Sequence, residues 1–285
     1  MQKLTATADA NVNKPKLVAP PGACDTHIHL FVPGSSYAPD SPYRAKDAPP
    51  EMFFELQKKL GLSTAVIVSP GGYGRDTSML ADVLAKHPQR FRGIALVKDD
   101  IEPSELVRLT RLGVKGMRMM SNKRGQHVPN FAPGIAAKVH EHGWHIQFYP
   151  HGTDITEYAD KLLSLKNDIV LDHFASIPAE GGTDQPAMKA VMKMLDTGRV
   201  WLKLSGPMRC TLQNAPYPSV TPIARALVKH APERLVWGSD WPHVNLDGRE
   251  MPDAGILLDL LREWVPDEAT RKRILVDNAN RLYGF

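Results

Sequence analysis

Residues 23–31 read ACDTHIHLF, and this stretch is the first of eight short apolar runs that decide the fold class. Its histidines, His27 and His29, are separated by one residue, so an extended strand would point both side chains to the same side. Seven further runs follow: TAVIVSP (64–70), GIALV (93–97), VKGMRMMS (114–121), WHIQFYP (144–150), DIVLDHF (168–174), VWLKLSG (200–206) and RLVWGSD (234–240). Their apolar and β-branched composition predicts eight strands.

Amphipathic stretches lie between these runs and predict helices. They cover residues 51–61, 78–87, 103–113, 132–143, 155–165, 186–195, 222–230 and 254–264. Strands that alternate with helices are typical of a parallel sheet with crossover helices. Eight of each, at a repeat of about 30 residues, predict a (β/α)8 TIM barrel of the α/β class. An open doubly wound sheet is the alternative, but it would usually carry a glycine-rich phosphate loop after its first strand, and DTHIHLFVPG (25–34) is not one.

The composition fits one globular domain. We assign residues 20–285 to a single barrel domain and residues 1–19, rich in Ala, Thr, Asn and Lys, to a flexible N-terminal arm. Apolar residues make up 42% of the 285 residues, which is enough for a core. Cys24 and Cys210 are the only cysteines and cannot form a disulfide framework, so a reducing compartment is expected.

Charge and hydropathy argue against several classes of partner. The net charge of +4 comes without a long Lys/Arg run, so we expect no nucleic acid; it suits an anionic small molecule. The N-terminal stretch has no apolar block typical of a signal peptide, and no apolar run is long enough to span a bilayer. We therefore expect a cytoplasmic protein that does not bind membranes.

The chemistry of a (β/α)8 barrel lies at the C-terminal ends of its strands, so the polar residues there are candidates for a site. The first, sixth and eighth runs end in four such residues: His27 and His29, His173, and Asp240. Other polar residues at this rim are Ser69, Arg118, Asn122, Arg124, Tyr149, His151, Lys203 and Ser205. A single histidine at a strand end is usually a packing residue, but four such side chains at one rim predict a catalytic site.

The motifs DTHIHLF, GMRMMSNKR, WHIQFY, IVLDHF, WLKLSG, VWGSDWPH and NANRLYG occur in this order along the chain. Together they resemble the amidohydrolase superfamily, whose signature is an HxH after the first strand, a later histidine and an aspartate after the eighth strand. More narrowly, nearly the whole chain from residue 20 is similar to the lactone-handling branch that includes 2-pyrone-4,6-dicarboxylate lactonase and D-galactarolactone isomerase. The resemblance implies an enzyme that acts on lactones.

The histidine pair raises the question of a metal. His27, His29 and Asp240 could hold one divalent cation, with His173 or His151 as a fourth ligand. Metal-dependent members usually add a carboxylate or a carbamylated lysine at the fourth strand, where this chain has Arg118, which cannot ligate a cation. The resemblance to the lactonase branch implies a reaction without metal or other cofactor. The three histidines would then donate hydrogen bonds to a carbonyl or carboxylate.

The rim also predicts how a substrate is held. Arg118 and Arg124 are expected to bind a carboxylate through their guanidinium groups, which favours an anionic lactone. Tyr149, Ser69 and Asn122 are further expected hydrogen-bond partners of the substrate.

Asp240 is the expected general base, and Asp25 is the alternative, to which we assign a structural role. If Asp240 deprotonates water, the lactone is hydrolysed; if it deprotonates another hydroxyl of the substrate, the lactone ring migrates. The segments ASIPAEGG (175–182) and PMRC (207–210) offer few basic residues for a second carboxylate, which favours a sugar-acid lactone. We therefore expect a D-galactaro-1,5-lactone to 1,4-lactone isomerase. The alternatives are a dicarboxylate lactonase and a non-catalytic sugar-acid binding protein.

Overall fold

The computed structural model describes residues 3–4, 12–39, 41, 43–121, 130–246 and 248–285. Its main sheet contains eight parallel strands: β2 (Cys24–Ile28), β4 (Thr64–Val68), β5 (Phe91–Ala95), β6 (Val114–Met120), β7 (His145–Tyr149), β8 (Ile169–Leu171), β9 (Val200–Ser205) and β10 (Leu235–Gly238). Each strand pairs with its neighbour in chain order. A bridge between Ile28 and Trp241 brings β2 beside the end of β10 and closes the barrel. The eight predicted strands and the predicted (β/α)8 barrel are confirmed.

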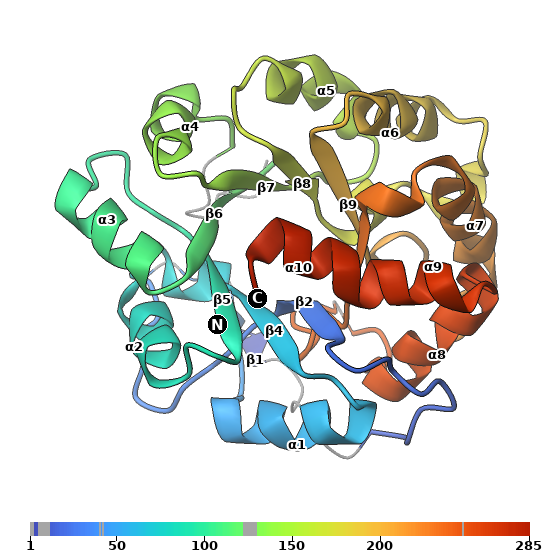
Figure 1. The fold of residues 1–285 in the computed structure, drawn as a ribbon, viewed down its shortest axis with the longest axis horizontal. Helices are drawn as coiled ribbons and strands as arrows, with labels where there is room; N and C mark the ends of the chain where they lie inside the picture. The colour runs from blue at the N-terminus through green and yellow to red at the C-terminus, as the bar shows by residue number, and fades with distance from the viewer. Residues whose placement is uncertain (1–2, 5–11, 40, 42, 122–129, 247) are drawn as a thin grey trace.

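Helices surround the strands as a ring (Figure 1). They are α1 (Pro50–Leu60), α2 (Ser78–Lys86), α3 (Pro103–Arg111), α4 (Pro133–His140), α5 (Ile155–Leu163), α6 (Pro186–Asp196), α7 (Thr221–His230) and α8 (Ala254–Trp264). These eight agree with the predicted helices. Two further short helices, α9 (Glu268–Lys272) and α10 (Asn278–Tyr283), were not predicted, and Figure 1 shows α10 across one end of the barrel.

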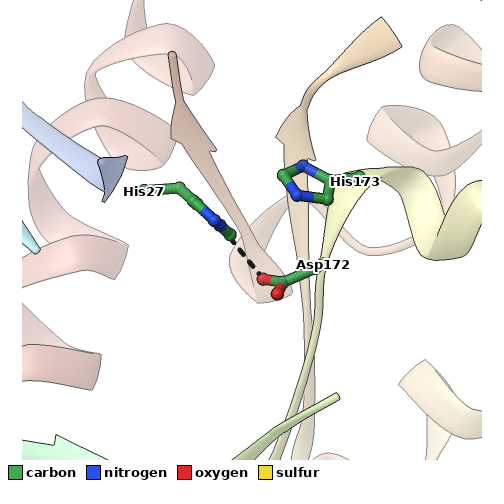
Figure 2. Close-up of side chains that lie close together, drawn as sticks. All are labelled: His27, Asp172 and His173. Atoms are coloured by element: carbon green, nitrogen blue, oxygen red, sulfur yellow. Dashed lines mark ion pairs between the residues drawn. The ribbon is translucent and has the colours of Figure 1, made fainter. Parts of the chain in front are cut away.

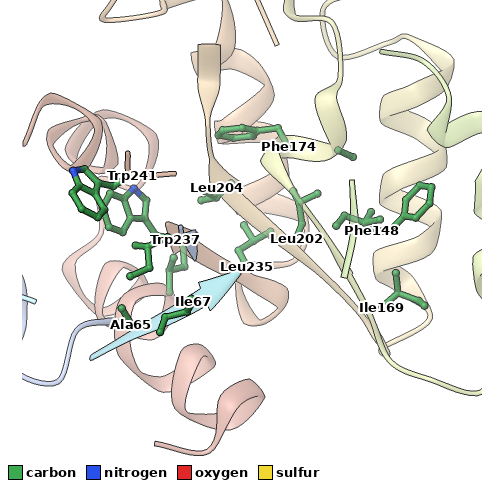
Figure 3. Close-up of a cluster of buried hydrophobic side chains, with 14 of the residues drawn as sticks. Ala65, Ile67, Phe148, Ile169, Phe174, Leu202, Leu204, Leu235, Trp237 and Trp241 are labelled. Atoms are coloured by element: carbon green, nitrogen blue, oxygen red, sulfur yellow. The ribbon is translucent and has the colours of Figure 1, made fainter. Parts of the chain in front are cut away.

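The strand side chains form two layers, one that faces the helices and one that faces the barrel interior. Alternate positions, including Ile67, Ile169, Leu202 and Leu204, are buried in the large core shared with the helices (Figure 3). The intervening positions point into the barrel. At the end of the barrel that α10 covers, Ala279 and Tyr283 of this helix pack against four inward side chains, those of Cys24, Val66, Val68 and Ile94. The period of two along each strand therefore separates a helix-facing core from the barrel interior.

Strand β9 shows how the interior changes along the barrel. Its inward positions are Trp201, Lys203 and Ser205, all buried. Trp201 packs with apolar residues of β8 and β10, Lys203 bonds to polar groups, and Ser205 contacts His173. The interior is thus apolar near α10, charged in its middle and polar at the C-terminal rim.

The segment before the barrel is bound to two parts of the structure. Lys3–Leu4 (β1) pairs in parallel with Tyr43–Arg44 (β3). Residues 13–17 reach α8, where the backbone N–H of Asn13 donates to Asp253 and that of Leu17 donates to Asp259, at 2.9 and 2.7 Å. None of the helices in the described ranges has the length and apolar character needed to cross a membrane.

Candidate active site

The first strand brings its histidines into the barrel through an irregularity. The register of β2 against β4 shifts between Asp25 and Ile28, which is the signature of a bulge. Asp25 Oδ1 accepts hydrogen bonds from the backbone N–H groups of His27 and Ser239, at 3.2 and 2.9 Å. Asp25 therefore ties β2 to the loop that follows β10.

The four residues predicted as catalytic lie together. Asp240 Oδ1 is 3.8 Å from His27 Nε2, 3.7 Å from His29 Nε2 and 3.7 Å from His173 Nε2. All four side chains are at least nine-tenths buried. Since hydrogen bonds to oxygen are typically shorter than 3.2 Å, these separations leave Asp240 Oδ1 without a direct bond to any of the three nitrogens.

His173 enters the site through an unusual turn. It directly follows Asp172 at the end of β8, and His173, Phe174, Ala175 and Ser176 all have left-handed backbones with φ between 50° and 52°. Consecutive residues on a strand point to opposite sides, yet Asp172 and His173 both face His27 (Figure 2). The left-handed turn is what allows both side chains to face the same site.

Asp240 is oriented by an arginine that the sequence analysis did not select. Arg209 donates from Nη2 and Nε to Asp240 Oδ2, at 3.0 and 3.3 Å. Its Nη1 and Nη2 also donate to the carbonyl oxygens of Asn245 and Val244, at 2.9 and 2.7 Å. These bonds fix one oxygen of Asp240 on Arg209 and leave the other facing the histidines. Burial raises the pKa of Asp240, and Arg209 opposes that rise.

Burial favours the neutral form of all three histidines. Burial lowers the pKa of His29 to about 3, and burial together with nearby cations lowers the pKa values of His27 and His173 well below their usual range. His29 Nδ1 lies 2.7 Å from the carbonyl oxygen of Val68, which can only accept a hydrogen bond. Nδ1 of His29 therefore carries the proton, and its Nε2 presents a lone pair to Asp240.

The predicted substrate-binding residues are placed as follows. Arg118 on β6 is 6% exposed, and its Nη1 donates to the carbonyl oxygen of Ser69 at 3.4 Å. Its Nε has no hydrogen-bond partner among the described residues and lies 3.9 Å from Asp172 Oδ2. The Tyr149 ring is 5.0 Å from the His173 ring and 4.7 Å from the His151 ring. Asn122 and Arg124 lie outside the described residues.

Two side chains that contact the predicted site residues were not selected from the sequence. Arg209 stands in PMRC, a segment noted only for its few basic residues, and Asp172 precedes the selected His173. The available signal was position: both residues follow strand ends that the barrel brings to one rim. No spacing rule predicts that Arg209, which follows β9, would contact Asp240, which follows β10.

The buried histidines and carboxylates of the site offer ligands for one divalent cation. His27, His29 and Asp240 each offer one ligand atom within 4.8 Å of the others, and so do His27, Asp172 and His173. Imidazole nitrogen and carboxylate oxygen are ligands that Zn²⁺ takes, and the lone pair on His29 Nε2 suits a cation. The residues therefore fit in number and type: His27, His29 and Asp240 would hold the ion, which would act as a Lewis acid on a carbonyl. The guanidinium of Arg209 on Asp240 opposes such an ion by charge repulsion.

The fold and the cluster of histidines and aspartate at the rim are those of a known enzyme family. Residues 24–285 match the amidohydrolase family, and the chain belongs to it. The predicted resemblance is confirmed.

The relatives that match along nearly the whole chain are named as enzymes that act on lactones. The chain is 35% identical to a 4-sulfomuconolactone hydrolase of Rhizobium radiobacter, over 93% of this chain and 91% of the relative. It is 34% identical to a 2-pyrone-4,6-dicarboxylate hydrolase of Comamonas testosteroni, over 96% and 94%. It is 28% identical to a D-galactarolactone isomerase of Agrobacterium fabrum, over 99% and 96%.

A solved structure shows the same fold along nearly the whole chain. The crystal structure of Agrobacterium tumefaciens ATU3138 without ligand superposes with a TM-score of 0.87 at 28% identity, covering 95% of this chain and 98% of that one.

Proposed function

We propose that this protein is a lactone hydrolase for an anionic lactone, with Asp240 as the general base and without a metal in the reaction. One observation carries the proposal. Asp240 Oδ1 and His29 Nε2 are both hydrogen-bond acceptors, and they face each other at 3.7 Å. While Asp240 is ionised, these two acceptors cannot bond to each other, but a water molecule lying beside the pair supplies two O–H groups, one for each.

In this mechanism the water is held by Asp240 and His29. Asp240 takes one proton as the water oxygen attacks the lactone carbonyl carbon, and His29 orients the other O–H bond. The carbonyl oxygen becomes an oxyanion, and His27 and His173 are the neighbours that would donate hydrogen bonds to it. The bond from the carbonyl carbon to the ring oxygen then breaks, and Asp240 returns its proton to that oxygen. The product is a hydroxy acid whose new carboxylic acid group still carries the second proton of the water and releases it to solvent to become a carboxylate.

The proposed substrate carries a negative charge because Arg118 faces the same site. Its Nε is buried and has no hydrogen-bond partner in the described part of the chain, so a ligand oxygen would satisfy it. Two relatives are named for substrates with carboxylate or sulfonate groups. A guanidinium can bind either kind of anion through two parallel hydrogen bonds.

The second candidate is the D-galactaro-1,5-lactone to 1,4-lactone isomerase favoured by the sequence. The loop after His173 reads FASIPAEGG and contains no basic residue for a second carboxylate. Isomerisation would use the same base on a hydroxyl of the substrate. That hydroxyl has one proton and would leave either Asp240 or His29 without a donor, which is why we place hydrolysis first.

The experiment that separates them is proton NMR and mass spectrometry in water enriched in ¹⁸O, with D-galactarolactone and 2-pyrone-4,6-dicarboxylate as separate substrates. Hydrolysis gives an opened acid that carries one ¹⁸O atom from the first turnover. Interconversion of 1,5- and 1,4-lactones without early label uptake would refute hydrolysis and support the isomerase. Asp240→Asn is the control, since an amide cannot accept the proton.

A further inference from the structure

A buried charged network lies directly beneath His27. Lys203 on β9 has no exposed surface, and its ammonium donates to the carbonyl oxygen of Thr26 at 2.9 Å and to Gln147 Oε1 at 2.7 Å. The Asp172 carboxylate is 3.4 Å from the same nitrogen. A lysine without solvent contact needs such partners, because an isolated buried charge is strongly destabilising.

Gln147 bonds to both charged groups of this network, and its amide can satisfy both in only one orientation. Its Oε1 accepts from Lys203, and its Nε2 donates to Asp172 Oδ2 at 3.1 Å. Exchanging the amide oxygen and nitrogen would place a donor against the ammonium and an acceptor against the carboxylate. The amide therefore holds Lys203 and Asp172 at fixed places on either side.

Both charged groups compete for the same atom of His27. Lys203 Nζ is 3.3 Å from His27 Nδ1. Asp172 Oδ1 is 3.2 Å from the same nitrogen, and Figure 2 marks this ion pair. Two of the three ammonium protons are used by Thr26 and Gln147. Two acceptors remain near the third proton, His27 Nδ1 at 3.3 Å and Asp172 Oδ1 at 3.4 Å, and of these contacts only the one to His27 has the geometry of a hydrogen bond. Asp172 Oδ1, in contrast, has no hydrogen-bond partner among the described residues, although it is nearer to His27 Nδ1 than Lys203 Nζ is. A hydrogen bond joins Lys203 Nζ and His27 Nδ1, and because an ammonium can only donate, Nδ1 is the acceptor.

We propose that Lys203 is a positioning residue that donates to His27 Nδ1 and so places the single imidazole proton on Nε2. His27 then faces the site as a donor, while His29, whose Nδ1 donates to Val68, faces it as an acceptor. The two histidines of one HxH motif carry opposite tautomers. Under the proposed function, on which the kinetic part rests, His29 binds the attacking water and His27 stabilises the carbonyl oxygen.

The first test measures the tautomer without substrate. Protein with ¹⁵N-labelled histidine rings is examined by NMR, and the His27 signals are assigned by their loss in His27→Asn. The wild type is expected to show the Nε2–H form for His27 and the Nδ1–H form for His29. An Nδ1–H form for His27 in the wild type would overturn the proposal and would leave the lactone hydrolase proposal standing.

Two variants and a control complete the test. In Lys203→Met the proton is expected to move to Nδ1, because only Asp172 remains beside it. In Asp172→Asn it is expected to stay on Nε2.

With an accepted substrate, Lys203→Met should lower kcat about 10- to 100-fold and change KM less than about threefold, since one oxyanion donor is lost. Lys115→Met removes a half-buried lysine of β6 outside the network and should leave both readouts unchanged. An unchanged tautomer in folded Lys203→Met would refute the role of Lys203.

Discussion

Replacing Arg209 by methionine tests whether this residue controls the base. The change keeps much of the side-chain volume but removes the guanidinium from Asp240, whose side chain is only 2% exposed. A pair of charges 3.0 Å apart is worth about 5 kcal/mol at an effective dielectric constant of about 20, and breaking buried pairs costs about 3–5 kcal/mol. We therefore expect Arg209→Met to lose about 3–5 kcal/mol of unfolding free energy at pH 8.

The loss should depend on pH with a defined sign. Burial already raises the folded-state pKa of Asp240 above its unfolded value, and Arg209 opposes this. Without Arg209 the folded-state pKa rises further. Between the unfolded and folded pKa values the native state holds the additional proton, so the stability of the variant falls as pH rises through this window. The deficit relative to wild type should be smallest near about pH 4, where unfolded aspartate titrates, and largest above the folded-state pKa.

Urea unfolding at several pH values and the pH profile of kcat/KM measure these effects. The acid limb of the profile should move to higher pH, because the base must be deprotonated. Arg249→Met is the matched control: Arg249 also donates to backbone carbonyls of this region, those of Leu246 and Met208, but makes no ion pair with Asp240. If both variants show the same acid limb and the same pH-independent loss of stability, Arg209 acts only through packing and its backbone contacts.

Three further outcomes are expected. Asp240→Asn should lower kcat by about 10²- to 10⁴-fold and still bind the lactone in calorimetry; near-normal turnover would assign the base elsewhere. Arg118→Ala should lower kcat/KM about 10- to 100-fold, from the loss of one charge-assisted contact of about 1.5–3 kcal/mol, and unchanged kinetics would remove it from substrate binding. Activity should survive exhaustive chelation; loss of activity together with stoichiometric metal, restored on adding the metal back, would contradict a metal-free reaction.

The fold was readable from sequence because every barrel strand is a short apolar run between amphipathic stretches. α9 and α10 were not, because five or six residues give too little periodicity. The convergence of His27, His29, His173 and Asp240 followed from the rule that strand ends share one rim. Their catalytic role, and the roles of Asn122 and Arg124, stay predictions.

The sequence could not predict that Asp172 and Arg209 would contact the site residues, and the reasons are physical. Period-two alternation would separate Asp172 from His173, and only the left-handed turn brings both to the site. Nothing in the letters HFAS signals this turn, since such residues normally avoid positive φ. Arg209 reaches Asp240 across a gap of 31 positions, which no local pattern encodes.

The left-handed turn at residues 173–176 also sets how heat should inactivate the protein. Each L-residue in this conformation costs roughly 1–2 kcal/mol against the right-handed alternative, so the packing of Phe174 and Ala175 in the core must hold the turn. When that packing loosens on warming, the backbone can relax to its opposite hand and withdraw His173 while the barrel persists. We expect activity to disappear several degrees below the loss of the far-ultraviolet circular dichroism signal, and to return on cooling.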